Sequence, residues 1–253
     1  MSHTTHLAAL GRAELTLFLR SRTNLVSALL VPLMLVFTMK IVLGQVDLAG
    51  AGLTLAPVMI SSSAGIILLM GLYAPLTNVY VMRREQLILK RQRSGEIEDI
   101  VILLGSAAPV VCAVPVQFVV IATGITVVSE AGAPAAPVLA VIGITLGAVL
   151  VAVLAALTTV MARTAESAQV AILPGLLVLP LTSGTYVPLE VLPHSVQEVL
   201  RFLPLTPVTD LVRSGWTGTM SVGEAALRTA TLLAWIALAG WAARRWFRWE
   251  PRR

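Results

Sequence analysis

The chain has 253 residues, of which 57% are hydrophobic and only 12% are charged, about half the charged fraction of roughly 25% that soluble domains carry. A soluble domain of this length cannot bury so much apolar surface, and an intrinsically disordered chain needs the opposite composition. Aromatic residues make up only 5%, and no series of alternating segments of about 10 residues appears, which argues against a β-barrel. The composition therefore predicts an all-α polytopic membrane protein.

The formal net charge is +5, with 18 basic and 13 acidic residues. In a membrane protein this excess indicates cytoplasmic anchoring segments rather than binding to nucleic acid. The predominance of Arg over Lys, with abundant Ala and Val, is typical of a bacterial genome of high GC content. Cys112 is the only cysteine, so no internal disulfide can form.

Six stretches with one charge or none are long enough for a transmembrane helix of about 20 residues. Lys40 lies near the outer end of the first stretch and Arg228 near the outer end of the last, where a long side chain can reach the polar interface. The predicted spans are Thr23–Gln45, Val58–Met82, Ile100–Ser129, Pro137–Ala162, Ser167–Leu189 and Ala225–Ala243.

The distribution of Lys and Arg predicts a multi-pass protein of the bacterial plasma membrane with both termini in the cytoplasm. In this orientation 14 of the 18 basic residues lie on the cytoplasmic side. Residues 1–22 then form either an interfacial helix or a plain extension of the first span. No soluble domain fits between the spans, so residues 1–253 are expected to form a single transmembrane domain.

The cytoplasmic segment 83–99 lies between the second and third spans. It contains helix-forming residues up to a stop at Ser94-Gly95. Residues 87–89 are too apolar for a free loop, and Glu85 is an acid within a basic run. We expect a short helix that docks into a partner protein; the alternative is a solvated positive-inside loop.

The external segment 188–223 lies between the fifth and sixth spans and is too polar to cross the membrane. Pro193 and Pro204 bracket one short helix, and Pro207 opens a second helical stretch. Such helices can re-enter the outer leaflet only where their backbone packs against protein. The alternative is an ordinary pair of surface helices.

Chemistry that other classes of membrane protein require is missing from the sequence. No Asp, Glu or His lies in the middle of a span, which argues against an ion-coupled carrier. The three histidines, His3, His6 and His194, form no convincing metal site. Neither Lys40 nor Lys90 lies in a phosphate-binding loop, so the chain is not expected to be an enzyme or to bind a cofactor, and any ATPase would be another chain.

Two groups of motifs resemble the type-2 ABC export permeases, a family that includes daunorubicin-type resistance permeases. That family has an Arg-Glu-x-Gly-Thr-Leu-like motif after its second span, and Arg84-Glu-Gln-Leu-Ile-Leu89 stands there with Leu-Ile in place of Gly-Thr. Its second signature is matched more fully, by Ser183-Gly184, Pro188-Leu-Glu-Val-Leu-Pro193, Pro204-Leu-Thr206 and Asp210-Leu-Val-Arg213.

The resemblance implies a division of labour between subunits. A separate ABC ATPase subunit would bind ATP and Mg and hydrolyse the nucleotide, and a second permease copy, identical or related, would complete the path. The cytoplasmic segment would be the coupling helix, with ATPase contacts expected at Arg84, Glu85, Leu87, Leu89, Lys90 and Arg91. The external segment would gate release through Tyr186, Pro188, Glu190, Pro193, Pro204, Thr206, Asp210 and Arg213.

A path without charges inside the spans suits an amphipathic or hydrophobic cargo, such as a drug, an antibiotic or a lipid-like molecule, better than a small ion. Polar residues in the spans are candidates for lining it, although such residues also stabilise helix packing. The candidates are Ser61, Ser62, Ser63, Asn78, Gln117, Thr182 and Ser183. Two alternatives to a permease stay open: a membrane scaffold or assembly protein without transport of its own, and a secondary carrier.

Overall fold

The computed structural model describes residues 34, 37–38, 40–45, 48, 50, 52–88 and 99–247. Residues 1–22, most of the first predicted span, and three predicted ATPase contacts (Leu89, Lys90 and Arg91) lie outside these residues.

All regular structure in the described part of the chain is helical. Five helices there are long and apolar enough to cross a membrane: Leu55–Glu85, which runs through α3 (Leu55–Ile66), the π-helix η1 (Ile67–Tyr73) and α4 (Ala74–Glu85), then α6 (Asp99–Val128), α7 (Pro137–Thr158), α8 (Ala165–Thr182) and α11 (Val222–Trp246). The prediction of an all-α membrane protein is confirmed. These helices correspond to the second to sixth predicted spans.

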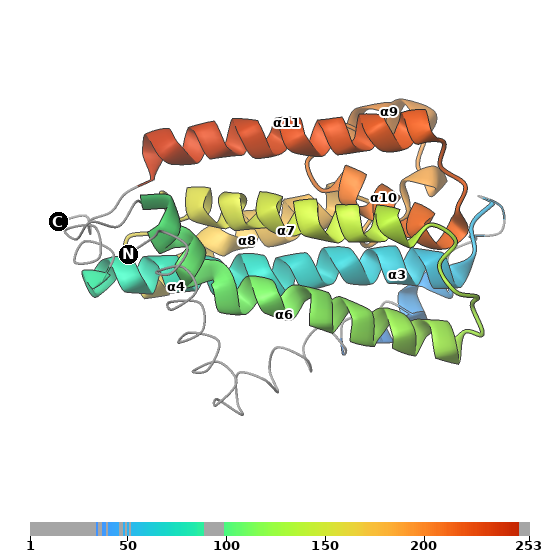
Figure 1. The fold of residues 1–253 in the computed structure, drawn as a ribbon, viewed down its shortest axis with the longest axis horizontal. Coiled ribbons are helices and arrows are strands. Elements are labelled where there is room, and N and C mark those ends of the chain that lie inside the picture. The colour runs from blue at the N-terminus through green and yellow to red at the C-terminus, as the bar shows by residue number, and fades with distance from the viewer. Residues whose placement is uncertain are drawn as a thin grey trace.

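Successive helices reverse direction, so the chain runs back and forth along the long axis of the molecule (Figure 1). Helices α4, α7 and α11 end, and α8 begins, at one end of the molecule, which we call the α4 end. The opposite end, which we call the α10 end, carries the short elements between α8 and α11. These are η2 (Leu189–Val191), α9 (His194–Leu200) and α10 (Thr206–Thr217).

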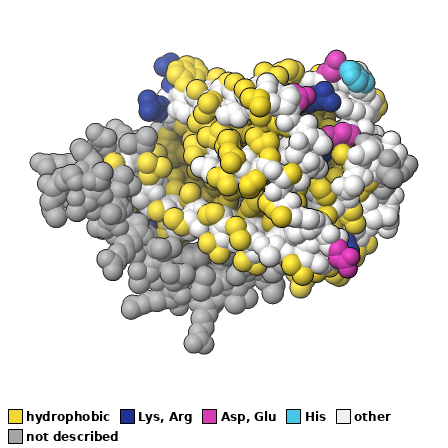
Figure 2. All heavy atoms as spheres, turned by 45° about the vertical axis from the view of Figure 1, so that its right-hand side comes forward, with side chains coloured by type: hydrophobic (Ala, Val, Ile, Leu, Met, Phe, Trp, Pro, Cys, Tyr) yellow, Lys and Arg dark blue, Asp and Glu magenta, His cyan; other side chains and the backbone are white. Residues whose placement is uncertain are grey.

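The core lies along the helix Leu55–Glu85, which is the most buried of the five long helices, whereas α8 and α11 are the most exposed. Figure 2 shows hydrophobic side chains over much of the visible face, with few charged side chains. An apolar surface of this extent marks contact with lipid or with another protein. The largest fully buried side chains include Ile60, Ile67, Leu68, Leu69, Leu72, Leu76, Ile102, Leu150, Leu205 and Leu211.

Helix α10 is buried although its sequence is too polar for a span. It packs against α3 and α7, and nine of its 12 residues are buried, including Thr206, Thr209 and Asp210. Close approach is possible because Gly215 faces α7: a Cβ atom there would lie 2.8 Å from the Cβ atom of Ala140. In contrast, α9 has no buried residue, so the alternative of a surface helix describes α9 but not α10.

The fifth predicted span is too long, because α8 ends at Thr182 and not at Leu189. Gly184 follows in the left-handed region at φ 74°, which no continuing helix allows. Pro174 and Pro180 lie inside α8 and do not end it.

Candidate functional site

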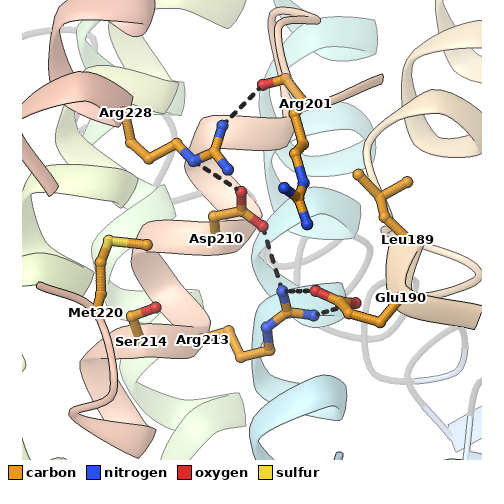
Figure 3. Close-up of a pocket in the computed structure, with 8 residues that line it drawn as sticks. All are labelled: Leu189, Glu190, Arg201, Asp210, Arg213, Ser214, Met220 and Arg228. Atoms are coloured by element: carbon orange, nitrogen blue, oxygen red, sulfur yellow. Dashed lines mark hydrogen bonds and ion pairs between the residues drawn. The ribbon is translucent and has the colours of Figure 1, made fainter. Parts of the chain in front are cut away.

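A network of charged side chains lies at the α10 end (Figure 3). The Nη1 atom of Arg213 donates to Oε2 of Glu190 at 3.0 Å, and its Nη2 atom donates to the other oxygen of the same carboxylate. That Nη2 atom also donates to Oδ1 of Asp210 at 3.3 Å. The Nε atom of Arg228 lies 3.1 Å from Oδ2 of Asp210, and Nη1 of Arg228 donates to the backbone carbonyl of Arg201 at 3.2 Å. We call these five residues the α10-end charge network.

The network joins four elements that are separate in the sequence. Glu190 belongs to η2, Arg201 directly follows α9, Asp210 and Arg213 lie three residues apart on one face of α10, and Arg228 lies near the start of α11. The planar guanidinium group of Arg213 meets both oxygens of Glu190, an arrangement that fixes the relative orientation of two groups as well as their distance. The external segment is therefore held to α11 by one ion pair, Arg228 with Asp210, and by one hydrogen bond, from Arg228 to the carbonyl of Arg201.

A cavity of about 120 Å³ lies against this network. Three arginines and two carboxylates line it, so its formal charge is one unit positive. The guanidinium group of Arg201 donates to Oε1 of Gln197 at 3.3 Å. Burial raises the pKa of the Asp210 carboxyl above its ordinary value, and the positive charges of Arg213 and Arg228 oppose that rise. The lining residues are Leu189, Glu190, Arg201, Asp210, Arg213, Ser214, Met220 and Arg228.

Three of the predicted gate residues, Glu190, Asp210 and Arg213, meet in this network. A fourth, Thr206, lies at the start of α10, where its hydroxyl donates to the carbonyls of Thr182 at 3.2 Å and Leu200 at 2.7 Å. The other four do not line the cavity. Pro188 and Pro193 directly precede η2 and α9, Pro204 lies in the turn before α10, and Tyr186 packs against the hydrophobic core.

Sequence reasoning missed two members of the network. Arg228 was expected to reach the membrane interface, and Arg201 was not among the predicted gate residues. The structure instead directs Arg228 to Asp210. The sequence carried one signal: the acidic residues of the external segment outnumber the arginines that lie close enough in the sequence to pair with them. This excess indicated that a basic residue from elsewhere in the chain joins the segment.

At the α4 end, Arg84 and Glu85 bind the turn between α7 and α8. The buried guanidinium group of Arg84 donates to the carbonyls of Thr159 at 3.0 Å and Ala162 at 2.7 Å. The Oε2 atom of Glu85 accepts a hydrogen bond of 3.0 Å from the backbone N–H of Ala165, the first residue of α8. Each charge thus lies where the helix dipole favours it, the cation at the end of α7 and the anion at the start of α8.

The predicted coupling helix is interrupted in the described residues. Helix α4 ends at Glu85, and Leu87 adopts a left-handed conformation at φ 58°, so Arg84, Glu85 and Leu87 do not lie on one helical face. The reason is that Arg84 and Glu85 continue α4 and face the α7–α8 turn. Arg84 is buried within this chain, whereas the side chain of Leu87 is 40% exposed and turns away from the core.

The candidate lining residues lie on several helices and not on one surface. Ser62 in α3, Gln117 in α6 and Ser183 after α8 are buried in the interior of the chain, as are Ser61 and Ser63. The Nε2 atom of Gln169 donates to Oδ1 of Asn78 at 3.3 Å, and the hydroxyl of Thr182 donates to a carbonyl of its own helix. Two of the buried groups, Oγ of Ser62 and Oε1 of Gln117, have no hydrogen-bond partner among the described residues.

Comparison with known proteins gives one family. Residues 5–216 match the family of ABC-2 type transporters. No curated protein matches the chain. The matched region contains both the Arg84-Glu85 pair and the external segment as far as α10. Because the match covers most of a chain built from apolar helices long enough to cross a membrane, the protein belongs to the ABC-2 type transporter family, as a multi-pass membrane permease subunit of an ABC transporter.

Proposed function

We propose that this chain is the permease subunit of an ATP-driven exporter that moves an amphipathic or hydrophobic molecule out of a bacterial cell. A separate ABC ATPase subunit binds ATP and Mg, and a second permease copy completes the path. The family match carries this proposal. The apolar outer surface of the described helices supports a membrane pathway for a cargo of this kind.

The two ends of the molecule have different tasks in this proposal. The α4 end faces the cytoplasm, and the segment 83–99 contacts the ATPase through Leu87 and the following residues Leu89, Lys90 and Arg91. The α10 end faces outward, and the α10-end charge network holds the external gate closed. The burial of α10 and the ion pairs of Arg213 and Arg228 support this assignment, because a gate needs contacts that can open as a unit.

Co-purification tests the proposal most directly. The tagged chain, expressed in its native membrane and solubilised in mild detergent, is expected to retain an ABC ATPase in a stoichiometric complex. Reconstituted into liposomes, the complex should move a fluorescent amphiphile in the presence of ATP and Mg, whereas the chain alone should hydrolyse no ATP. A chain that purifies without any ATPase would support the membrane scaffold instead.

A further inference from the structure

We propose that α8 transmits movement between the ATPase end and the external gate, and that Glu85 is the positioning residue at one end of this connection. The inference rests on the proposed function and assigns the link within it. It stands on two sets of contacts, one at each end of α8. We call them the α4–α8 joint and the α8–α10 joint.

The α4–α8 joint binds the start of α8 to the last turns of α4. The carboxylate of Glu85 accepts a hydrogen bond of 3.0 Å from the backbone N–H of Ala165. This N–H belongs to the first turn of α8, where no carbonyl within the helix can reach it. One and two turns earlier on the same face of α4, Val81 belongs to a small buried cluster with Ala168 and Ala171 of α8, and Asn78 accepts from Gln169. Three successive levels of contact therefore fix α8 to α4.

The α8–α10 joint binds the other end of α8 to the buried helix of the external segment. The hydroxyl of Thr209 donates to the carbonyl of Ser183 at 2.6 Å, and the hydroxyl of Thr206 shares its proton between the carbonyl of Leu200 at 2.7 Å and that of Thr182, the last residue of α8, at 3.2 Å. Carbonyls at a helix C-terminus have no partner within their own helix, so these two hydroxyls satisfy groups that must be paired when buried. Asp210 of the charge network follows Thr209 directly.

Between the joints, α8 makes close contact with η1 at one position. A Cβ atom on Gly175 would lie 2.3 Å from the hydroxyl oxygen of Tyr73, and that hydroxyl is bonded to Thr158 of α7 at 2.8 Å. The same face of α8 packs against the hydrophobic core through the buried Ile172 and through Leu176 and Leu179, whereas Val170, Leu173 and Leu177 are exposed on the outer face.

The 18 residues of α8 span about 27 Å at 1.5 Å per residue. A helix held to its own chain at both ends, and packed against the core along one face between them, can carry a displacement over that length. A push on the segment after Glu85 reaches α8 through Ala165 and reaches α10 through Thr182 and Ser183. In this arrangement Glu85 acts through α8 and makes no contact with cargo.

The test uses the purified permease–ATPase complex with a cysteine reporter at the gate. Ser214 is 7% exposed and lines the cavity, and the change Ser214→Cys is nearly isosteric. In a Cys112→Ala background, the rate at which a maleimide modifies this cysteine reports opening of the α10 end. We expect ATP, Mg and vanadate to change this rate roughly tenfold, within the range of typical couplings between sites.

Two substitutions separate the role of Glu85 from a general effect of charge. Glu85→Ala removes the bond to Ala165, and Glu166→Ala, the matched control, removes an exposed acid from the same first turn of α8. Glu85→Gln keeps an oxygen that can accept from Ala165. We expect Glu85→Ala to keep the ATPase bound and hydrolysing ATP while the nucleotide-dependent change in labelling is lost, and the other two variants to retain it.

The outcomes distinguish this inference from the proposed function. If Glu85→Ala shows the wild-type change in labelling, or if Glu166→Ala loses it equally, α8 does not carry the movement through Glu85. If Glu85→Ala releases the ATPase, Glu85 contributes to ATPase binding and the positioning role is overturned. If the wild-type complex itself shows no response to nucleotide, the exporter proposal fails.

Discussion

Asp210 is the residue on which the α10-end charge network depends, because its two carboxylate oxygens accept from two different arginines. Arg213 reaches it from one turn further along α10, and Arg228 reaches it from α11. All three side chains are at least four-fifths buried. A largely buried charge is tolerated only when it is paired, so the loss of one member leaves the others in an unfavourable state.

Arg213→Ala is expected to destabilise the protein, because it leaves Glu190 and Asp210 without their shared partner. Removal of one member of a buried pair costs about 3–5 kcal/mol. The matched control is Glu198→Ala, which removes the exposed pair of His194 and Glu198 and should change stability by at most about 1 kcal/mol. Unfolding by SDS titration in mixed micelles measures both, and equal effects of the two variants would contradict a structural role for the network.

Leu87→Gly provides a second test at the scale of one residue. A left-handed conformation costs a residue with a side chain roughly 1–2 kcal/mol, and glycine avoids that cost. We expect Leu87→Gly to leave the free energy of unfolding unchanged or to raise it, and Leu87→Val to lower it. The same glycine variant should bind the ATPase more weakly if the exposed Leu87 side chain belongs to the interface, which co-purification measures; unchanged retention would remove Leu87 from the proposed contact.

At the scale of elements, the π-helix η1 interrupts the long helix Leu55–Glu85 where two other helices approach closely. Gly71 faces Gln117 of α6, where a Cβ atom would lie 2.7 Å from Oε1, and Tyr73 lies against Gly175 of α8. Wider turns of this kind often occur at functional sites. Here the wider turn presents Tyr73 to both α7 and α8.

Gly175→Ala is expected to lower stability by about 1–3 kcal/mol, because the added methyl group overlaps the Tyr73 hydroxyl and forces the two helices apart. Gly124→Ala is the control: Gly124 lies inside α6 and has no atom within 4 Å of the added Cβ position. That change should be neutral or stabilising by up to about 1 kcal/mol. Thermal unfolding in detergent compares them, and a neutral Gly175→Ala would show that α8 is loosely packed at its midpoint.

The sequence predicted the long helices well and the short ones in part. Gaps between charged residues located five of the observed helices. A charge inside a membrane span is costly, so long uncharged stretches mark the spans directly in the sequence. The burial of α10 could not be read from the sequence, since Thr206, Thr209 and Asp210 are buried through pairing with residues on other elements. The same reason explains Arg84, whose partners are backbone carbonyls 75 and 78 residues away.

At the scale of the whole molecule, the alternating direction of the helices places the end of α4 and the external segment at opposite ends (Figure 1). The described beginning of the cytoplasmic segment, residues 83–88, and the external segment therefore lie where a membrane-crossing chain would expose them to different sides. The positive-inside rule predicts that the α4 end faces the cytoplasm.

Cysteine reporters check this orientation. In a Cys112→Ala background, Gln86→Cys should react with a membrane-impermeant maleimide only in inverted vesicles, and Ser195→Cys should react in intact cells. Both positions are exposed, so differences in burial do not affect the comparison. The reverse labelling pattern would invert the proposed topology and would place the basic segments outside.

The position of Arg228 has a consequence for biosynthesis. Helices enter the membrane as the ribosome makes them, at about 5–20 residues per second, and α11 is made after every other described helix. Until it arrives, Asp210 lacks one of its two arginines, and the end of α9 lacks the bond from Arg228 to the carbonyl of Arg201. The α10 end of the molecule therefore closes only after α11 has been made, and a chain truncated before residue 222 would expose α10, without its Arg228 contacts, to membrane proteases.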